Sequence, residues 1–231
     1  MKTIGLIGGM TWHSTIEYYR LINSGIQSRL GGSHSAQCIL YSLDFHDLER
    51  QQIEGGWEGI AKTIADAARS VERAGADALL ICANTMHRVA GIVEAAVSIP
   101  LIHIADTAAR EIQRQKLRTV GLLGTRFTME QEFYRDRLES HHGLRVLIPE
   151  PEERDIIHRV IYEELGHGLV LDRSREHYRD IITGLQDRGA EGVILGCTEI
   201  PLLVKPEDST IPSFDTTALH AAAAVEFATG P

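Results

Sequence analysis

Cysteine is scarce in this sequence. Three cysteines, Cys38, Cys82 and Cys197, occur among 231 residues, and no two of them have Cys-x-x-Cys spacing. An odd and sparse set of this kind argues against a disulfide framework and favours a reducing compartment, so we expect a cytoplasmic protein. The first residues, MKTIGLIGGMTW, also lack the apolar core and the cleavage site of a signal peptide.

Long apolar runs and basic blocks are missing as well. No stretch approaches the roughly 20 apolar residues of a membrane-spanning helix. The net charge of -9 is not offset by a basic cluster, so we expect neither nucleic acid nor a membrane as a partner. An anionic small-molecule substrate would instead be held by local groups, such as backbone amides at helix N-termini.

The residues that bind common cofactors are few or wrongly spaced. The four lysines lie outside the predicted strand-end motifs, which disfavours a pyridoxal-phosphate Schiff base. The 11 histidines include no H-E-x-x-H motif, so ligand spacing gives no support for a metal site. Gly5, Gly8 and Gly9 do not have the G-x-G-x-x-G spacing of a dinucleotide site. We therefore expect no cofactor, and interpret Gly8 and Gly9 as allowing close backbone approach to a ligand.

What the chain does contain is an alternation of short β-branched runs with longer amphipathic stretches, which is typical of a parallel α/β protein. The capping box Ser14 to Glu17 predicts the start of the first helix. Strands are predicted at 3–8, 37–43, 78–82, 101–104, 119–123, 145–148 and 192–196. Helices are predicted at 57–73, 85–96, 107–115, 129–138, 174–186 and 216–228.

Two pairs of segments repeat along the chain. KTIGLIG from Lys2 resembles RTVGLLG from Arg118, an offset of 116 residues, and GADALLICANT from Gly75 resembles GAEGVILGCTE from Gly189, an offset of 114. Two ordered matches at nearly one offset predict two copies of one unit. We expect two pseudo-symmetric α/β/α lobes with parallel four-stranded sheets, residues 1–98 plus 207–231 and residues 99–206, with the active site between lobes at the strand ends.

Cys197 is the strongest candidate for chemistry. It follows the apolar run Val193 to Leu195, where a strand ends, and this position is expected to lower the pKa of the thiol from about 8.5 and to expose it to a ligand. Thr198 supplies a hydroxyl and Glu199 a possible proton partner. The alternative is a buried structural cysteine, which is how most free cysteines behave.

The repeat aligns Ala83 with Cys197. Asn84 and Thr85 then begin a helix, where they can bind a carboxylate or cap the helix. Cys82 should face away from the site and serve packing. Further candidates for substrate binding follow the other strands: Met10, Thr11, Thr125 and Thr128, with Trp12 beside them.

These motifs resemble those of the aspartate/glutamate racemase family over essentially the whole chain. The resemblance rests on GGMTWHSTIEYYRLIN, ANTMH, LLGTRFTM and GCTEI. It implies a two-lobe fold, cofactor-independent racemisation of aspartate, glutamate or a broader set of amino acids, and a homodimer. By this resemblance Cys197 is one acid/base, and Asn84, Thr85, Thr125 and Thr198 hold the α-carboxylate.

The chain departs from that pattern at Ala83, where family members usually carry cysteine or, in one branch, threonine. A methyl group transfers no proton, so we expect a second base to be missing. The alternatives are impaired racemisation, a one-base lyase resembling the arylmalonate decarboxylases, and an inactive amino-acid-binding variant.

Overall fold

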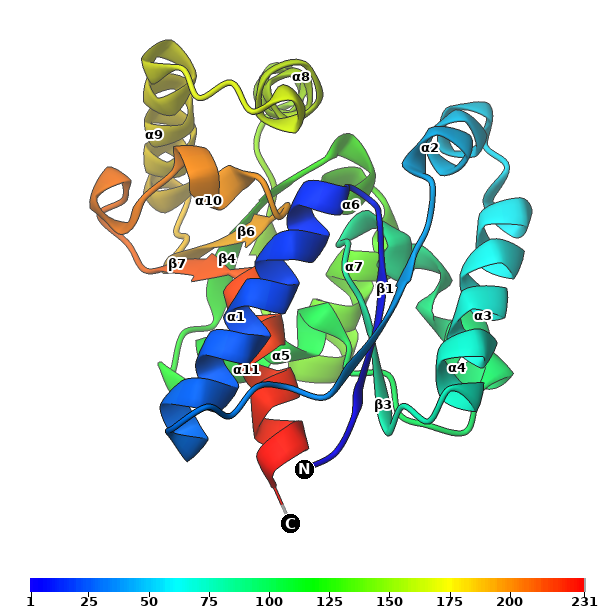
Figure 1. Ribbon diagram of the computed structural model, residues 1–231. Coiled ribbons are helices and arrows are strands. Elements are labelled where there is room, and N and C mark those ends of the chain that lie inside the picture. Colours follow the sequence, from blue (N-terminus) through cyan, green and yellow to red (C-terminus); the bar gives the residue numbers. More distant parts are fainter. Residues whose placement is uncertain (231) are drawn as a thin grey trace. The chain divides into compact units, whose positions relative to one another are not determined.

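A computed structural model describes residues 1–230 of the chain (Figure 1). These residues form two compact units. Unit 1 comprises Met1–Ile104 together with the chain from His220 on, and unit 2 comprises Ala105–Leu219. Within residues 1–230, no helix is both long enough and apolar enough to cross a membrane.

Unit 1 is built on a parallel sheet of three strands in the order β2-β1-β3. The strands are β1 (Ile4–Gly8), β2 (Cys38–Ser42) and β3 (Ala78–Ile81). The helices are α1 (Trp12–Leu30), α2 (Phe45–Glu54), α3 (Trp57–Arg73), the 3₁₀ helix η1 (Thr85–Val89) and α4 (Ala90–Ala96).

Two apolar layers cover the unit 1 sheet. Side chains that alternate along β1 point to opposite faces. Leu6 therefore packs with α1 and with α11 (Thr216–Thr229), whereas Ile7 packs with α3. Figure 1 shows α1 and α11 on one side of β1 and β3, and α3 on the other. The C-terminal helix packs on this unit, since Ala221 and Ala224 lie in the cluster of Leu6.

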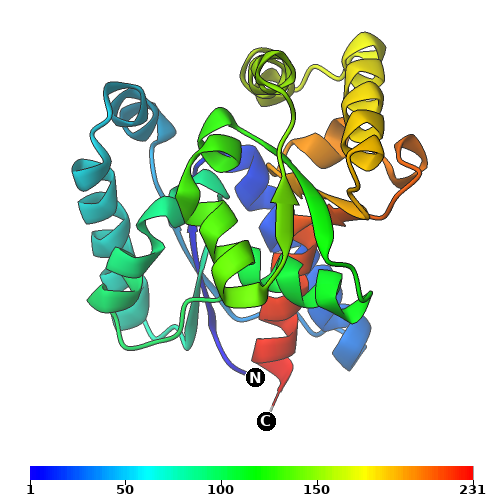
Figure 2. The same cartoon turned by 180° about the vertical axis from the view of Figure 1, so that it is seen from behind.

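Unit 2 contains a four-stranded parallel sheet in the order β5-β4-β6-β7. The strands are β4 (Thr119–Gly124), β5 (Arg145–Leu147), β6 (Gly192–Gly196) and β7 (Ser213–Asp215). The helices are α5 (Ile104–Arg114), α6 (Arg126–Glu130), α7 (Glu132–Asp136), η2 (Arg137–His141), α8 (Pro151–Arg159), η3 (Val160–Glu164), η4 (Leu165–His167), α9 (Asp172–Asp187), α10 (Ile200–Leu203) and η5 (Pro206–Asp208). Figure 2 shows α7 on one side of the β5 arrow and α9 on the other.

The register of the strands confirms the internal repeat. In unit 1, Ile7 on β1 lies beside Ile81 on β3, and in unit 2, Leu123 on β4 lies beside Leu195 on β6. The two sequence offsets carry the first pair onto the second. Each unit therefore has a central strand with the same neighbour in the same register, which is the pseudo-symmetric two-lobe α/β fold expected from the sequence.

The prediction of four strands per sheet is wrong for unit 1. Leu101 forms only an isolated bridge with Leu79, and α5 begins at Ile104. The backbone N–H of Leu79 donates to the Pro100 carbonyl, and the Leu79 carbonyl accepts from the backbone N–H of Ile102. The chain then turns into the helix. The apolar residues at 101–104 thus serve a single bridge and the first turn of a helix rather than a strand.

The capping box predicted at Ser14 is also wrong. Helix α1 begins at Trp12, and the side chain of Thr11 accepts a hydrogen bond from the backbone N–H of Ser14. Glu17 instead accepts two hydrogen bonds from the Arg20 guanidinium, which holds the pKa of that carboxyl below its usual range. The N-cap of α1 is therefore Thr11 and not Ser14.

Candidate functional site

Cys197 lies directly after β6, at the carboxyl end of the unit 2 sheet. Its side chain is buried in the apolar cluster that contains Leu123, Leu195 and Tyr178. The thiol nevertheless has a polar neighbour, because Cys197 Sγ donates to Glu199 Oε2 at 3.0 Å. The hydroxyl of Thr198 donates to the same carboxylate oxygen at 2.6 Å. The GCTE segment thus forms a compact thiol, hydroxyl and carboxylate group on one turn of chain.

The prediction that the strand end exposes Cys197 and lowers its pKa is wrong on both points, since the residue is buried. Burial raises the pKa of this thiol well above its usual value, and the negative charge of Glu199 and its hydrogen bond raise it further. Hydrogen bonds from the backbone amides of Glu199 and Thr198 favour the thiolate but are outweighed. The sulfur therefore carries its proton at neutral pH, and that proton is directed at a carboxylate.

Thr125 and Thr128 flank the end of the neighbouring strand. Gly124 on β4 lies beside Gly196 on β6, so Thr125 and Cys197 follow adjacent strand ends. Thr125 caps α6 by accepting from the backbone N–H of Thr128 at 3.3 Å, and the two hydroxyls lie 3.2 Å apart. The structure thus brings together five of the predicted residues at one edge of the unit 2 sheet: Thr125, Thr128, Cys197, Thr198 and Glu199.

The remaining predicted residues gather at the corresponding edge of unit 1. Met10 and Thr11 follow β1, and Ala83 follows β3, its neighbour in the sheet. Ala83 is buried and packs in the same apolar cluster as Met10. Cys82 lies on the other face among the residues of α1 and α11, which confirms its expected packing role. Burial also raises the pKa of the Cys82 thiol.

Asn84 and Thr85 open the helix that follows Ala83. Asn84 is buried and occupies the N-cap position of η1, but its side chain makes no capping hydrogen bond. The first turn of the predicted helix is 3₁₀ rather than α, and α4 continues it from Ala90. Asn84 therefore does not cap η1 through its side chain, and its carboxylate-binding role stays a prediction.

Gly8 and Gly9 are explained by packing of the chain on itself. A Cβ on Gly8 would lie 2.5 Å from Thr15 Cγ2, and one on Gly9 would lie 2.1 Å from the carbonyl oxygen of Leu43. Gly9 also has a φ of 89°, which glycine adopts readily and other residues rarely do. The contacts with Thr15 and Leu43 are enough to require glycine at both positions, and close approach to a ligand stays a prediction.

Sequence reasoning missed the segment after β7, Asp215 to Thr217. Asp215 pairs with Leu195, so this segment also begins at the edge where Cys197 lies. The Thr216 hydroxyl donates to the Leu195 carbonyl at 2.8 Å, and the buried Thr217 hydroxyl has no hydrogen-bond partner. The N-cap pattern Asp-Thr-Thr before an apolar helix could have marked it. A strand of three residues was too short to recognise.

No group of three or more His, Cys, Asp or Glu side chains suited to a metal ion occurs within residues 1–230.

Comparisons with known proteins agree over nearly the whole chain. The sequence model of the Asp/Glu/Hydantoin racemase family matches residues 7–224. A solved structure from Yersinia pestis, assigned to the Asp/Glu racemases, is 50% identical, covers 100% of both chains and superposes with a TM-score of 0.95. An aspartate racemase homologue from Pyrococcus horikoshii OT3 is 38% identical, with 100% coverage of both chains and a TM-score of 0.86. The broad specificity amino-acid racemase RacX of Bacillus subtilis is 22% identical over 232 residues, 96% of each chain.

Proposed function

Because the chain belongs to the Asp/Glu/hydantoin racemase family, and hence to the isomerases, we propose that it removes and returns the α-proton of an amino acid without a cofactor. The substrate is aspartate, glutamate or a broader set of amino acids, and inversion to the other enantiomer is impaired because Ala83 stands at the position of the second base. Cys197 is the acid/base. The observation that carries this proposal is the contact of its thiol with the Glu199 carboxylate at 3.0 Å.

The thiol must lose its proton before it can act as a base. In the proposed first step, the proton on Cys197 Sγ moves to Glu199 Oε2, and the backbone amides of Thr198 and Glu199 stabilise the thiolate that forms. The thiolate then takes the α-proton of the substrate, and the electron pair of the C–H bond passes into the α-carbon and its carboxylate. The reverse steps return a proton to carbon and restore the thiol.

The developing charge on the substrate needs hydrogen-bond donors, since no cofactor delocalises it. We assign the α-carboxylate to the side chains and backbone amides of Asn84, Thr85, Thr125 and Thr198. Thr128 supports Thr125 through the hydroxyl contact at 3.2 Å. Met10 and Thr11 would contact the substrate from the end of β1.

Ala83 sets the stereochemical course. It occupies the position in unit 1 that corresponds to Cys197 in unit 2, and a methyl group has no proton to transfer. A chain with one base is expected to exchange the α-proton of one enantiomer with solvent while retaining its configuration. The same feature favours the second candidate, a one-base decarboxylase, in which loss of carbon dioxide creates the carbanion and Cys197 protonates it on a single face.

The test is α-proton exchange in deuterium oxide with single enantiomers of aspartate, glutamate and homoserine, followed by NMR, with chiral chromatography of the recovered amino acid. The expected result is deuterium incorporation in one enantiomer with little inversion, and its loss in the Cys197→Ser variant. Carbon dioxide release from disubstituted malonates, without amino-acid exchange, would support the decarboxylase. Tight amino-acid binding without either reaction would identify a binding protein.

Three further assignments are part of this proposal. We place the protein in the cytoplasm, because its three cysteines are all free thiols. We propose a homodimer on the basis of the family resemblance. We also propose that the protein has two domains, one formed by residues 1–98 with 207–231 and the other by residues 99–206.

A further inference from the structure

His87, which the mechanism above does not use, contacts the backbone of the residue that corresponds to the catalytic cysteine. Its imidazole is buried, and Nδ1 lies 2.9 Å from the carbonyl oxygen of Ala83. On the other side of the ring, Nε2 accepts a hydrogen bond from the backbone N–H of Ile104 at 3.3 Å. A backbone N–H can only donate and a carbonyl can only accept. These two contacts therefore fix a neutral ring with its proton on Nδ1.

The Ala83 carbonyl needs this donor because of how the following helix is wound. In an α-helix the backbone N–H of His87 would donate to the carbonyl of residue 83, four positions earlier. Here η1 is a 3₁₀ helix, and that N–H donates to Asn84 instead, at 3.1 Å. A buried carbonyl without a donor costs free energy. The His87 side chain thus replaces the hydrogen bond that its own backbone has given up.

In unit 2 the corresponding carbonyl has a backbone donor instead of a side-chain donor. After β6 the Cys197 carbonyl accepts a hydrogen bond from the backbone N–H of Ile200 at 3.2 Å. The turn that carries Cys197 is therefore closed by backbone alone, whereas the turn that carries Ala83 is closed by an imidazole. The two repeats differ in sequence at this point, and in unit 1 the histidine side chain supplies the donor.

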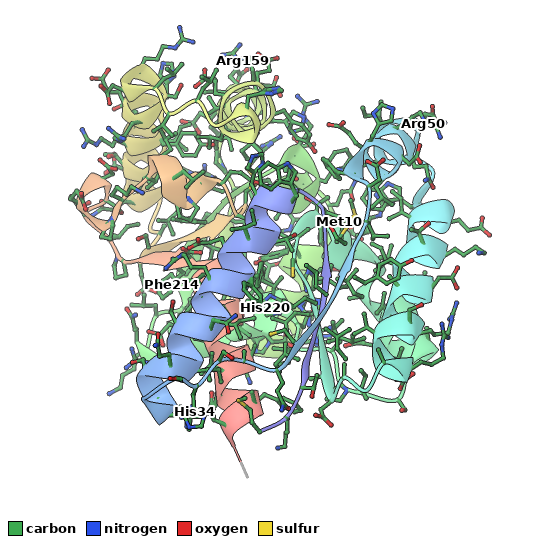
Figure 3. The ribbon with its side chains drawn as sticks, in the orientation of Figure 1. Met10, His34, Arg50, Arg159, Phe214 and His220 are labelled. Atoms are coloured by element: carbon green, nitrogen blue, oxygen red, sulfur yellow. The ribbon has the colours of Figure 1, made fainter. Side chains whose placement is uncertain are left out.

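The His87 ring belongs to a buried group of histidines in unit 1. His87 packs edge-on against His103, with ring centroids 4.5 Å apart, and its ring lies 5.8 Å from that of His220 (labelled in Figure 3). His220 Nε2 donates to the Ile102 carbonyl at 2.6 Å, and its Nδ1 lies 2.8 Å from the Tyr18 hydroxyl. The His87 ring thus packs between α11 and the chain at Ile102–Ile104, while its position relative to Ala83 is set by its own two hydrogen bonds.

We propose that His87 is a positioning residue for the first-base position. Its Nδ1–H holds the Ala83 carbonyl and so fixes the direction of the residue 83 side chain and of Asn84 and Thr85 behind it. The kinetic consequence rests on the proposed function, since it assumes that this turn meets the substrate. The tautomer and the geometry of the turn do not depend on it.

The first test measures the tautomer of His87 and the geometry of the turn by NMR, without any reaction. In ¹⁵N-labelled protein at neutral pH, the His87 ring is expected to be neutral with Nδ1 protonated and Nε2 not. In the His87→Leu variant, the backbone amide signals of Asn84 and Thr85 should shift, while in His87→Asn, whose side-chain amide can still donate to Ala83, they should stay near their original positions. A charged ring, an Nε2–H tautomer or unmoved signals in His87→Leu would overturn the inference.

The second test reads kinetics in an Ala83→Cys background, where residue 83 can transfer a proton. His87→Leu should lower kcat for racemisation by about tenfold or more with a smaller change in KM, because small misplacements of a reacting group cost rate. His87→Asn should recover most of that loss. His220→Asn, which removes a buried histidine of the same group that does not contact Ala83, should keep kcat near the parent value.

The outcomes separate the two proposals. Equal losses in His87→Leu, His87→Asn and His220→Asn, in proportion to lost stability, would reduce His87 to a packing residue and overturn the inference. Absence of exchange in every variant would instead refute the proposed function, and the NMR test would then decide the role of His87 by itself.

Discussion

The Ala83→Cys substitution should convert single-face proton exchange into racemisation. It places a thiol at the position that corresponds to Cys197 in the repeat, on a turn whose carbonyl His87 already holds. With a proton donor on each turn, the α-carbon can lose its proton to one sulfur and gain one from the other. The parent chain is expected to return deuterium to the face that lost the proton, so inversion is the new event.

The size of the gain follows from what a general acid/base contributes. Such a group typically accelerates a proton transfer by about 10²–10⁴-fold. We therefore expect the rate of inversion to rise at least about 100-fold over the parent chain, which corresponds to roughly 3 kcal/mol of transition-state stabilisation.

The substitution adds one buried atom to the cluster that contains Met10 and Met86. Methionine side chains adapt to added volume, so the loss in folding stability should stay at about 1 kcal/mol.

The assay compares deuterium incorporation with inversion for one enantiomer of each substrate. Ala83→Val is the matched control, because it adds bulk at the same position but no transferable proton. Ala83→Cys with Cys82→Ala excludes a contribution from the neighbouring thiol, which packs on the opposite face. If inversion appears equally in Ala83→Val, or if Ala83→Cys exchanges protons as before without any inversion, the assignment of residue 83 to the second base is refuted.

Burial and the charge of Glu199 raise the pKa of Cys197, so thiolate formed by loss of the proton to solvent is scarce at pH 7 and grows as the pH increases. This population adds to the thiolate formed through Glu199, and the rate of exchange should therefore rise from pH 7 to 9. Glu199→Gln removes the charge that raises this pKa and should move the rise to lower pH, while the rate at pH 7 falls about 10²-fold for lack of a proton acceptor; a profile unchanged by the substitution would contradict the Cys197–Glu199 contact as the source of the thiolate. Thermal unfolding of Gly5→Ala and Gly121→Ala compares two equivalent glycines of the repeat. A Cβ on Gly5 would lie 2.3 Å from Val71 Cγ1, whereas a Cβ on Gly121 would lie 2.8 Å from Leu185 Cδ1, at the flexible end of that side chain. Gly5→Ala should cost about 2–3 kcal/mol and lower Tm by roughly 5–10 °C, and Gly121→Ala clearly less; equal losses would show that the two glycines pack alike.

The sequence by itself was sufficient for the two-lobe α/β fold, although not for the number of strands in unit 1. Strands such as β1 and β6 are short apolar runs that end in glycine, and α3 has apolar residues at helical spacing from Trp57 to Arg73, so local patterns predicted them. The repeat added what periodicity cannot, because its offset of 114 residues aligned Ala83 with Cys197. These features are visible locally because each depends on residues close together in the chain.

The tertiary structure decided the electrostatics and the supporting contacts. Strand-end placement alone predicted a lowered pKa for Cys197, but the burial that raises it comes from helices distant in sequence, such as α9 with Tyr178. The role of His87 could not be inferred either, since it depends on a 3₁₀ turn and on Ile104, 17 residues away. Burial and hydrogen-bond partners depend on packing between distant segments, so the pattern of residues along the sequence does not predict them directly.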